Sequence, residues 1–334
     1  SSLSEGSKSN LLFFCPAAKK GEPQEPVYGI NASSGELLWT NAERLKKPYP
    51  PSTNMGNPTI GADGTVYVSN HWRYIWAFEG ETGKLKWEFN VGKGGFATYP
   101  VLGSDGTVFV GSWGGLYAID SKTGKKKWTS LKGEVTENFP VVGREDTVFI
   151  GARNKKFFAV DGKTGAKKWE INLSGESRWR SSTLCSDGQL LIPTDAGLHS
   201  VDSATGTETW RLNGKNDLEV RHRLSSDGTL YLRIDNILHA IQTATGPDPK
   251  ALWPQVGYNG ANTAFTGEKQ QFPLRIPKDA TLFESQKTEL ELAADSKKLQ
   301  GQTWSKARDG LLLWLDASDV DGNGKTDPAR ETYP

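Results

Sequence analysis

The stretch that decides the fold is Ala118-Ile119-Asp120-Ser121-Lys122-Thr123-Gly124-Lys125-Lys126-Lys127-Trp128. It has the form A-x-D-x-x-T-G-K-x-x-W, and close copies end at Trp87 and Trp169. Looser copies end at Trp39 and Trp210, and a sixth keeps Thr-Gly but then runs Pro-Asp-Pro before Trp253. The successive tryptophans are separated by 48, 41, 41, 41 and 43 residues. A period of this size is typical of one four-stranded propeller blade.

A second strand is predicted ahead of each copy, after Asp-Gly or a near variant. These runs of β-branched and aromatic residues cover 64–68, 106–110, 146–150, 188–192 and 228–232. Asp-Gly supplies the positive φ angles of a tight hairpin, and Thr-Gly begins the next turn. Residues 11–14 form the same strand in the first repeat, which we expect to lack its innermost strand. The recurring Trp should pack against the neighbouring blade, with its N–H bonded to a turn carbonyl.

The sequence therefore predicts an all-β protein, a β-propeller of four-stranded blades with six visible repeats. Over roughly residues 10–265 the repeats resemble the tryptophan-docking repeats of the quinoprotein (PQQ-type) alcohol dehydrogenase superfamily. That superfamily also includes a bacterial outer-membrane assembly lipoprotein. Because its members usually have seven or eight blades, the six repeats are either part of a larger ring or closed by the segment after Trp253.

Three regions are expected along the chain. Residues 1–265 form the propeller, and residues 266–308, which are poorer in Gly and Trp, form a spacer or a truncated β module. Residues 309–334 contain the run Gly310 to Asp327, which resembles the opening strand of concanavalin-like (LamG-like) jelly-roll domains. The resemblance implies the start of such a domain.

Composition excludes several classes of function. Forty basic residues stand against thirty-nine acidic ones, so the net charge predicts no nucleic-acid partner. No apolar run approaches the roughly 20 residues that span a bilayer, so no membrane span is expected. Cys15 and Cys185 are too far apart in sequence to indicate a disulfide framework or a zinc site, and their redox state stays open.

One calcium site is predicted near the C-terminus. Oxygen donors stand at loop positions 1, 3, 5 and 9 with Gly324 at position 6; the donors are Asp319, Asp321, Asn323 and Asp327. This spacing can wrap a hard Ca²⁺ ion, although Arg330 replaces the bidentate Glu at position 12. The alternative is a polar turn after a strand.

A ligand-binding rim is predicted near the propeller axis. The segments before the Asp-Gly strands of two adjacent blades carry Arg178-Trp179-Arg180 and Arg221-His222-Arg223. Arginines beside an aromatic ring can hold carboxylates or sulfates. The alternative is a solvated rim paired with Glu176 and Glu219. His199 and His239 occupy a repeat position that is aromatic elsewhere, so they are expected to pack rather than to bind metal.

Function is predicted as a non-catalytic scaffold that binds a protein, peptide or glycan partner. A quinone-dependent dehydrogenase of the resembled family would use adjacent cysteines and a carboxylate cluster, and Cys15 and Cys185 are not adjacent. Bound PQQ is therefore not expected. The alternatives are a PQQ-dependent dehydrogenase and an outer-membrane assembly factor. The resemblance and the calcium loop imply a secreted, cell-surface or periplasmic location.

Overall fold

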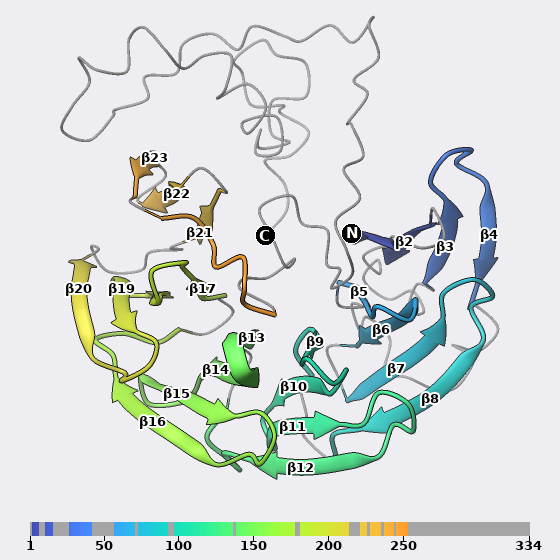
Figure 1. Ribbon diagram of the computed structural model, residues 1–334, viewed down its shortest axis with the longest axis horizontal. Helices are drawn as coiled ribbons and strands as arrows, with labels where there is room; N and C mark the ends of the chain where they lie inside the picture. Colours follow the sequence, from blue (N-terminus) through green and yellow to red (C-terminus); the bar gives the residue numbers. More distant parts are fainter. Residues whose placement is uncertain are drawn as a thin grey trace, which may run out of the picture.

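The computed structural model describes twelve segments of the chain: residues 2–6, 11–15, 27–41, 57–70, 73–92, 97–135, 138–177, 181–213, 221–225, 228–234, 237–243 and 245–252. These residues form six antiparallel sheets, of which five have four strands and one has three. The sheets follow one another in sequence order around an arc, each with its first strand toward the centre (Figure 1). The predicted all-β propeller fold is thus confirmed.

The blades share one strand order, from the innermost strand to the outermost. Blade one contains β1 (Ser2–Gly6), β2 (Leu11–Cys15), β3 (Tyr28–Asn31) and β4 (Leu37–Thr40). Blade two contains β5 (Thr59–Ile60), β6 (Thr65–Ser69), β7 (Tyr74–Glu79) and β8 (Leu85–Asn90). Blade three contains β9 (Val101–Leu102), β10 (Val108–Ser112), β11 (Gly115–Ile119) and β12 (Lys126–Ser130).

The second half of the arc repeats this order. Blade four contains β13 (Val141–Val142), β14 (Thr147–Gly151), β15 (Lys156–Asp161) and β16 (Lys167–Asn172). Blade five contains β17 (Thr183–Leu184), β18 (Gln189–Thr194), β19 (Gly197–Asp202) and β20 (Glu208–Asn213). Blade six contains β21 (Arg221–Leu224), β22 (Thr229–Ile234) and β23 (Ile237–Gln242).

The innermost strand of the first blade corrects the sequence prediction. The first repeat was expected to lack this strand, but β1 pairs with β2 in register from Ser2–Cys15 to Gly6–Leu11. The strand Ser-Leu-Ser-Glu-Gly is mostly polar and has no Asp-Gly turn after it, so neither composition nor punctuation marks it in the sequence.

The hydrophobic core lies between neighbouring blades. One buried cluster joins Phe109 and Leu116 of blade three to Val148 and Phe158 of blade four. The second strand of blades two to four is buried along its whole length, which explains its continuous run of apolar and β-branched residues. Each blade therefore buries its faces against its neighbours, as expected for a repeat architecture.

The segment after the sixth Thr-Gly turn does not continue as an outer strand. Instead, residues 245–252 run along blade five, where Ser186 N donates to Gly246 O and Asp248 N donates to Leu184 O. Ala251 is buried in the core between blades four and five. Pro247 and Pro249 have no amide hydrogen to give to a strand ladder, which explains why the segment leaves the blade.

Candidate functional site

Each blade has two edges where its strands are connected, and we name each edge after the kind of connection that it carries. The turn edge carries the Asp-Gly turns and the Thr-Gly turns. The hairpin edge carries the hairpins between the second and third strands and the connections that lead to the next blade. The repeat motif of the sequence lies on the turn edge, and the predicted rim residues Arg221 to Arg223 lie in β21, the innermost strand of blade six.

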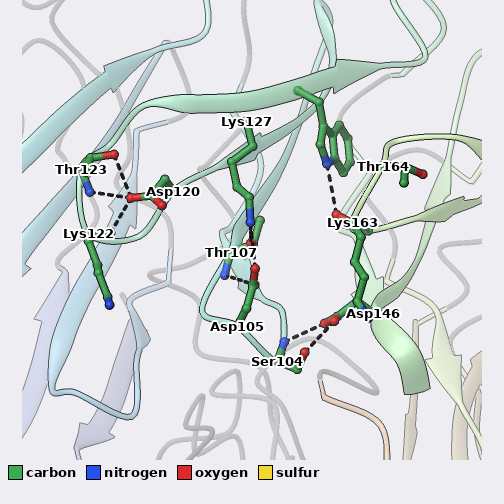
Figure 2. A network of polar contacts seen from close by, with 12 residues as sticks. Ser104, Asp105, Thr107, Asp120, Lys122, Thr123, Lys127, Asp146, Lys163 and Thr164 are labelled. Carbon is green, nitrogen blue, oxygen red and sulfur yellow. Dashed lines mark hydrogen bonds and ion pairs between the residues drawn. The ribbon is translucent and has the colours of Figure 1, made fainter.

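The aspartate of the repeat motif holds its own turn on the turn edge. Asp120 Oδ1 accepts hydrogen bonds from Lys122 N, Thr123 N and Thr123 Oγ1 at 3.1, 2.8 and 2.8 Å (Figure 2). Asp161 and Asp202 repeat this arrangement in blades four and five. These bonds lower the pKa of Asp120, with the Thr123 hydroxyl as the largest cause. The aspartate is therefore a turn-forming residue in these three blades.

A bulge precedes this turn in blades one to five. The pairing of the third and fourth strands shifts register between Ala77 and Phe78, and at the equivalent positions of blades one, three, four and five. A bulge increases local twist and re-aims the following side chains. It places the outer-strand tryptophan opposite the small Ala, Ser or Gly of the motif, as in the Ala118–Trp128 pair.

The tryptophan of each of the first four blades docks on the next blade. A side chain at Gly165, where φ is +76°, would begin 2.9 Å from the Trp128 ring, so the ring lies directly against this turn. Trp128 Nε1 donates to Gly162 O at 3.1 Å, and its ring lies 5.8 Å from that of Phe109 in its own blade. Trp39, Trp87 and Trp169 make the matching bonds to the next blade, at 2.7 to 2.9 Å. The predicted turn-carbonyl partner is thus confirmed for four blades.

Trp210 departs from this pattern. It was expected to pack against the neighbouring blade as the others do, but 45% of its surface is exposed, whereas Trp128 and Trp169 are half-buried. The blade that follows it is the three-stranded one, whose Thr-Gly turn leads into the segment along blade five rather than into an outer strand.

Lysines of the outer strands bind the Asp-Gly turns of the same blade. Lys127 Nζ contacts Asp105 Oδ2 at 2.8 Å and Thr107 Oγ1 at 2.7 Å (Figure 2). This contact and the bonds from Thr107 lower the pKa of Asp105 to about 2 despite its partial desolvation. Lys86 contacts Asp63 and Thr65 in the same way in blade two.

Blade four modifies the Asp-Gly turn. Glu145 and Asp146 stand in place of Asp-Gly, and both have positive φ, at 55° and 57°. Asp146 accepts hydrogen bonds from Ser104 N and Ser104 Oγ of blade three, both at 2.6 Å (Figure 2). Aspartate adopts the left-handed conformation more readily than most residues other than glycine. The hydrogen bonds from Ser104 hold Asp146 in this conformation, which glycine adopts at the same position in blades two, three, five and six.

A cavity opens at the turn edge between blades four and five. It encloses about 390 Å³ and is lined by Arg144, Lys168, Asp187, Ser203 and Asp248, among others. Arg144 Nε and Nη2 donate to Asp248 Oδ2 and Oδ1 at 2.9 and 3.0 Å, so the segment after blade six closes one side. Lysine and arginine face aspartates and a glutamate here, so the lining favours no single sign of charge.

Part of the predicted rim lies outside the described residues, namely Arg178, Trp179 and Arg180. Arg221 begins β21 on the neighbouring blade. The adjacent His222 is buried, and its Nε2 lies 2.9 Å from Thr183 Oγ1 in the innermost strand of blade five. Burial and the charge of Arg223 lower the pKa of His222 to about 4, so the ring is neutral near pH 7. Burial also lowers the pKa of Arg223. The His222 side chain thus joins two blades.

His199 packs as predicted. Its ring is fully buried, with Nδ1 2.7 Å from Glu208 Oε1 and Nε2 2.9 Å from Ser174 Oγ. Desolvation lowers its pKa more than Glu208 raises it. The other ring in this class, His239, lies in β23.

The two cysteines lie in different blades. Both are buried free thiols, in blade one for Cys15 and after β17 for Cys185. Burial raises the pKa of each to about 12, which makes both unreactive near pH 7.

The predicted calcium loop, with Asp319, Asp321, Asn323 and Asp327, lies outside the described residues. Among the residues that are described, no group of three or more His, Cys, Asp or Glu side chains could hold a metal ion. Over the same residues there is no helix with the length and hydropathy of a membrane span.

The sequence prediction missed one cluster on the hairpin edge. The hairpin between β10 and β11 exposes Trp113, and the next hairpin places the Arg153 guanidinium 5.8 Å from the centre of that ring. Exposed lysines flank the pair at Lys132 and Lys155. Neither hairpin belongs to the repeat motif, so spacing along the chain gave no signal for the cluster.

The docked tryptophans and radial sheets define the class of the protein, a β-propeller of tryptophan-docking blades. The family described as "Outer membrane protein assembly factor BamB" matches residues 23–190, and the chain belongs to this family. The dehydrogenase subunit of the quinone alcohol dehydrogenase of Acetobacter aceti is 33% identical over 116 residues. That match covers 31% of this chain, and the chain spans 15% of that relative's length.

Solved structures share the fold at low identity. The quinohemoprotein alcohol dehydrogenase from Comamonas testosteroni has a TM-score of 0.50 and 14% identity, covering 71% of this chain and 52% of that one. BamB from Moraxella catarrhalis has a TM-score of 0.49 and 15% identity, covering 74% and 73%. At these identities the likeness concerns the fold alone.

Proposed function

We propose that this protein is a non-catalytic propeller of the bacterial cell envelope that binds protein partners through its hairpin edge. The observation that carries this proposal is the family match over residues 23–190, to a family described as an outer membrane protein assembly factor. Such a role needs a rigid scaffold with exposed loops, because loops on a fixed framework carry most binding functions.

The use of charge in the described blades supports a scaffold. The motif aspartates bind their own turns, and Lys86 and Lys127 bind Asp-Gly turns. Asp146 and Asp248 hold blades together. These groups have structural partners within the propeller. We also propose that Arg178, Trp179, Arg180, Arg221 and Arg223 contact the partner protein.

Site-specific cross-linking tests this proposal. A photoreactive residue at position 180 of the full gene product should form adducts with envelope proteins in cells, whereas one at Lys122 on the turn edge should form few. The same adducts from both positions, or none from position 180, would count against a binding role for the hairpin edge.

A quinone-linked dehydrogenase is the second candidate, favoured by the identity to the Acetobacter aceti subunit. An absorbance titration with pyrroloquinoline quinone and Ca²⁺ separates the two. We expect no saturable binding and no alcohol oxidation. Stoichiometric binding would move the dehydrogenase into first place.

We further propose that Asp319, Asp321, Asn323 and Asp327 bind Ca²⁺ weakly. Their oxygen donors at loop positions 1, 3, 5 and 9 support this, and the missing bidentate Glu argues for low affinity. Calorimetric titration should show one site that Asp321→Ala removes. Unchanged calcium uptake in that variant would refute the assignment.

A further inference from the structure

We infer that the hairpin edge between blades three and four is a docking surface for an acidic protein segment that carries an apolar or aromatic side chain. The surface consists of Trp113, Lys132, Arg153 and Lys155, and we call it the indole–cation surface. The inference rests on the proposed binding function, to which it adds a location and the chemistry of the partner.

The four side chains come from three segments that contact one another. Arg153 N donates to Glu134 O at 2.7 Å, which joins the blade-four hairpin to the connection that carries Lys132. A side chain at Gly115 would begin 3.3 Å from Lys132 Cα, so this connection also lies against the hairpin of Trp113. The Arg153 guanidinium over the Trp113 ring completes the cluster.

The indole is exposed although hydrophobic. In Trp113, 42% of the surface is open, compared with 7% in the docked Trp87. Trp113 is outside the repeat motif, so blade docking does not explain a tryptophan at this place. Tryptophan and arginine are enriched among the residues that dominate protein interfaces, and a partner that covers the ring would bury apolar area.

The cations of the surface have no carboxylate partner within the described part of the chain. Among the described residues near this surface, Lys156 pairs with Glu134 at 3.8 Å and with Glu170 at 2.6 Å. No ion pair in the segments that the structure describes involves Lys132, Arg153 or Lys155. The nearby Glu134 is thus already paired. Three positive charges that form no ion pair among the described residues favour an acidic partner and speed its encounter.

The backbone holds this surface in a fixed conformation. Asn154 and Lys155 have φ values of 58° and 61°, as the two central residues of a type I′ hairpin require. Lys156 N donates to Arg153 O, and Leu173 N donates to Lys155 O. Because both neighbours of Asn154 are tied to the blade by these bonds, binding would cost little ordering of the loop.

Fluorescence anisotropy with three labelled peptides tests the inference on the whole chain. The first peptide alternates Glu and Phe, the second replaces Glu with Gln, and the third replaces Phe with Ala. We expect the Glu–Phe peptide to bind best, with an affinity that falls as salt rises. Equal binding of all three peptides, or preference for the Gln–Phe peptide, would overturn the acidic–aromatic assignment.

Surface variants locate the binding. Trp113→Ala, and separately Arg153→Glu with Lys155→Glu, should weaken the Glu–Phe peptide about tenfold or more, as for anchor residues of other interfaces. The matched control is Lys122→Glu with Lys126→Glu, two exposed lysines of blade three that lie away from the hairpins. If the control weakens binding equally, attraction is a general charge effect and the surface is not the site.

Two further outcomes separate this inference from the proposed function. If heparin binds the surface and the Glu–Phe peptide does not, the ligand is an anionic polysaccharide and the inference is wrong. If Arg153→Glu with Lys155→Glu leaves the envelope cross-links from position 180 unchanged and also leaves peptide binding intact, this surface fails while the scaffold function stands.

Discussion

The indole nitrogen of Trp87 donates a hydrogen bond of 2.7 Å to the carbonyl of Ser121 in the next blade. Trp128 and Trp169 make the same contact with Gly162 and Ser203, each again 34 residues further along the chain. Each of these indoles also lies 5.8 Å from an aromatic ring of its own blade. Since each contact joins only adjacent blades, the stability of the arc depends on a series of neighbour interactions.

Trp128→Ala should lower the free energy of unfolding by about 3–5 kcal/mol, as for other large core deletions. The substitution removes a ring packed between Phe109 and Gly165 and leaves the Gly162 carbonyl without its indole partner. Urea denaturation followed by circular dichroism measures the change. Trp113→Ala is the control, because its exposed ring should cost less than about 1 kcal/mol. Equal losses in the two variants would contradict the docking interpretation.

Gly165→Ala tests the close approach of the Trp128 ring to Gly165 separately from the effect of the backbone conformation. Gly165 and Gly133 have nearly equal φ values of 76° and 75°, but a Cβ at Gly133 would meet nothing within 4 Å. Both variants pay about 1 kcal/mol for the left-handed conformation. Gly165→Ala should lose about 1–3 kcal/mol more from overpacking against Trp128. Similar melting temperatures for the two variants would show that the ring moves aside easily.

The repeat could be predicted from the sequence because the residues that form each blade lie close together along the chain. The Thr-Gly turn, the apolar second strand and the regularly spaced Trp each mark the sequence within one blade. Contacts between residues that are far apart in the sequence have no recognisable sequence pattern. Asp248 reaches Arg144 over 104 residues, and Arg153 lies over Trp113 because two hairpins of adjacent blades meet. The same limit applies to the indole–cation surface, whose residues lie outside the repeat motif.

The ion pair between Arg144 and Asp248 should hold the segment after blade six against the propeller. Asp248 is buried, so removing Arg144 would leave a buried carboxylate without its ion-pair partner. In a double-mutant cycle with Arg144→Ala and Asp248→Asn, the coupling in unfolding free energy should exceed that of the exposed Lys127–Asp105 pair. Trypsin should also cleave at Lys250 faster in either single variant. A coupling no larger than that of the exposed pair would mean that the segment is held by its backbone bonds alone.

His222 should make the protein less stable in acid. Its pKa is about 4 in the folded protein and 6.5 in its unperturbed form, so the unfolded chain takes up a proton first as the pH falls. The contribution of neutral His222 to the free energy of unfolding is fully present above pH 6.5. It is lost progressively as the pH falls to about 4, and the total loss is on the order of 3 kcal/mol.

The variant His222→Gln isolates this contribution. Glutamine can still bond to Thr183 Oγ1 but does not titrate, so its unfolding free energy should decline less steeply between pH 6.5 and 4. His199 is present in both proteins, and its own lowered pKa therefore cancels in the comparison. Parallel pH profiles for the two proteins would show that His222 has its ordinary pKa of 6.5 in the folded protein. The contact between the inner strands of blades five and six would then be open to water.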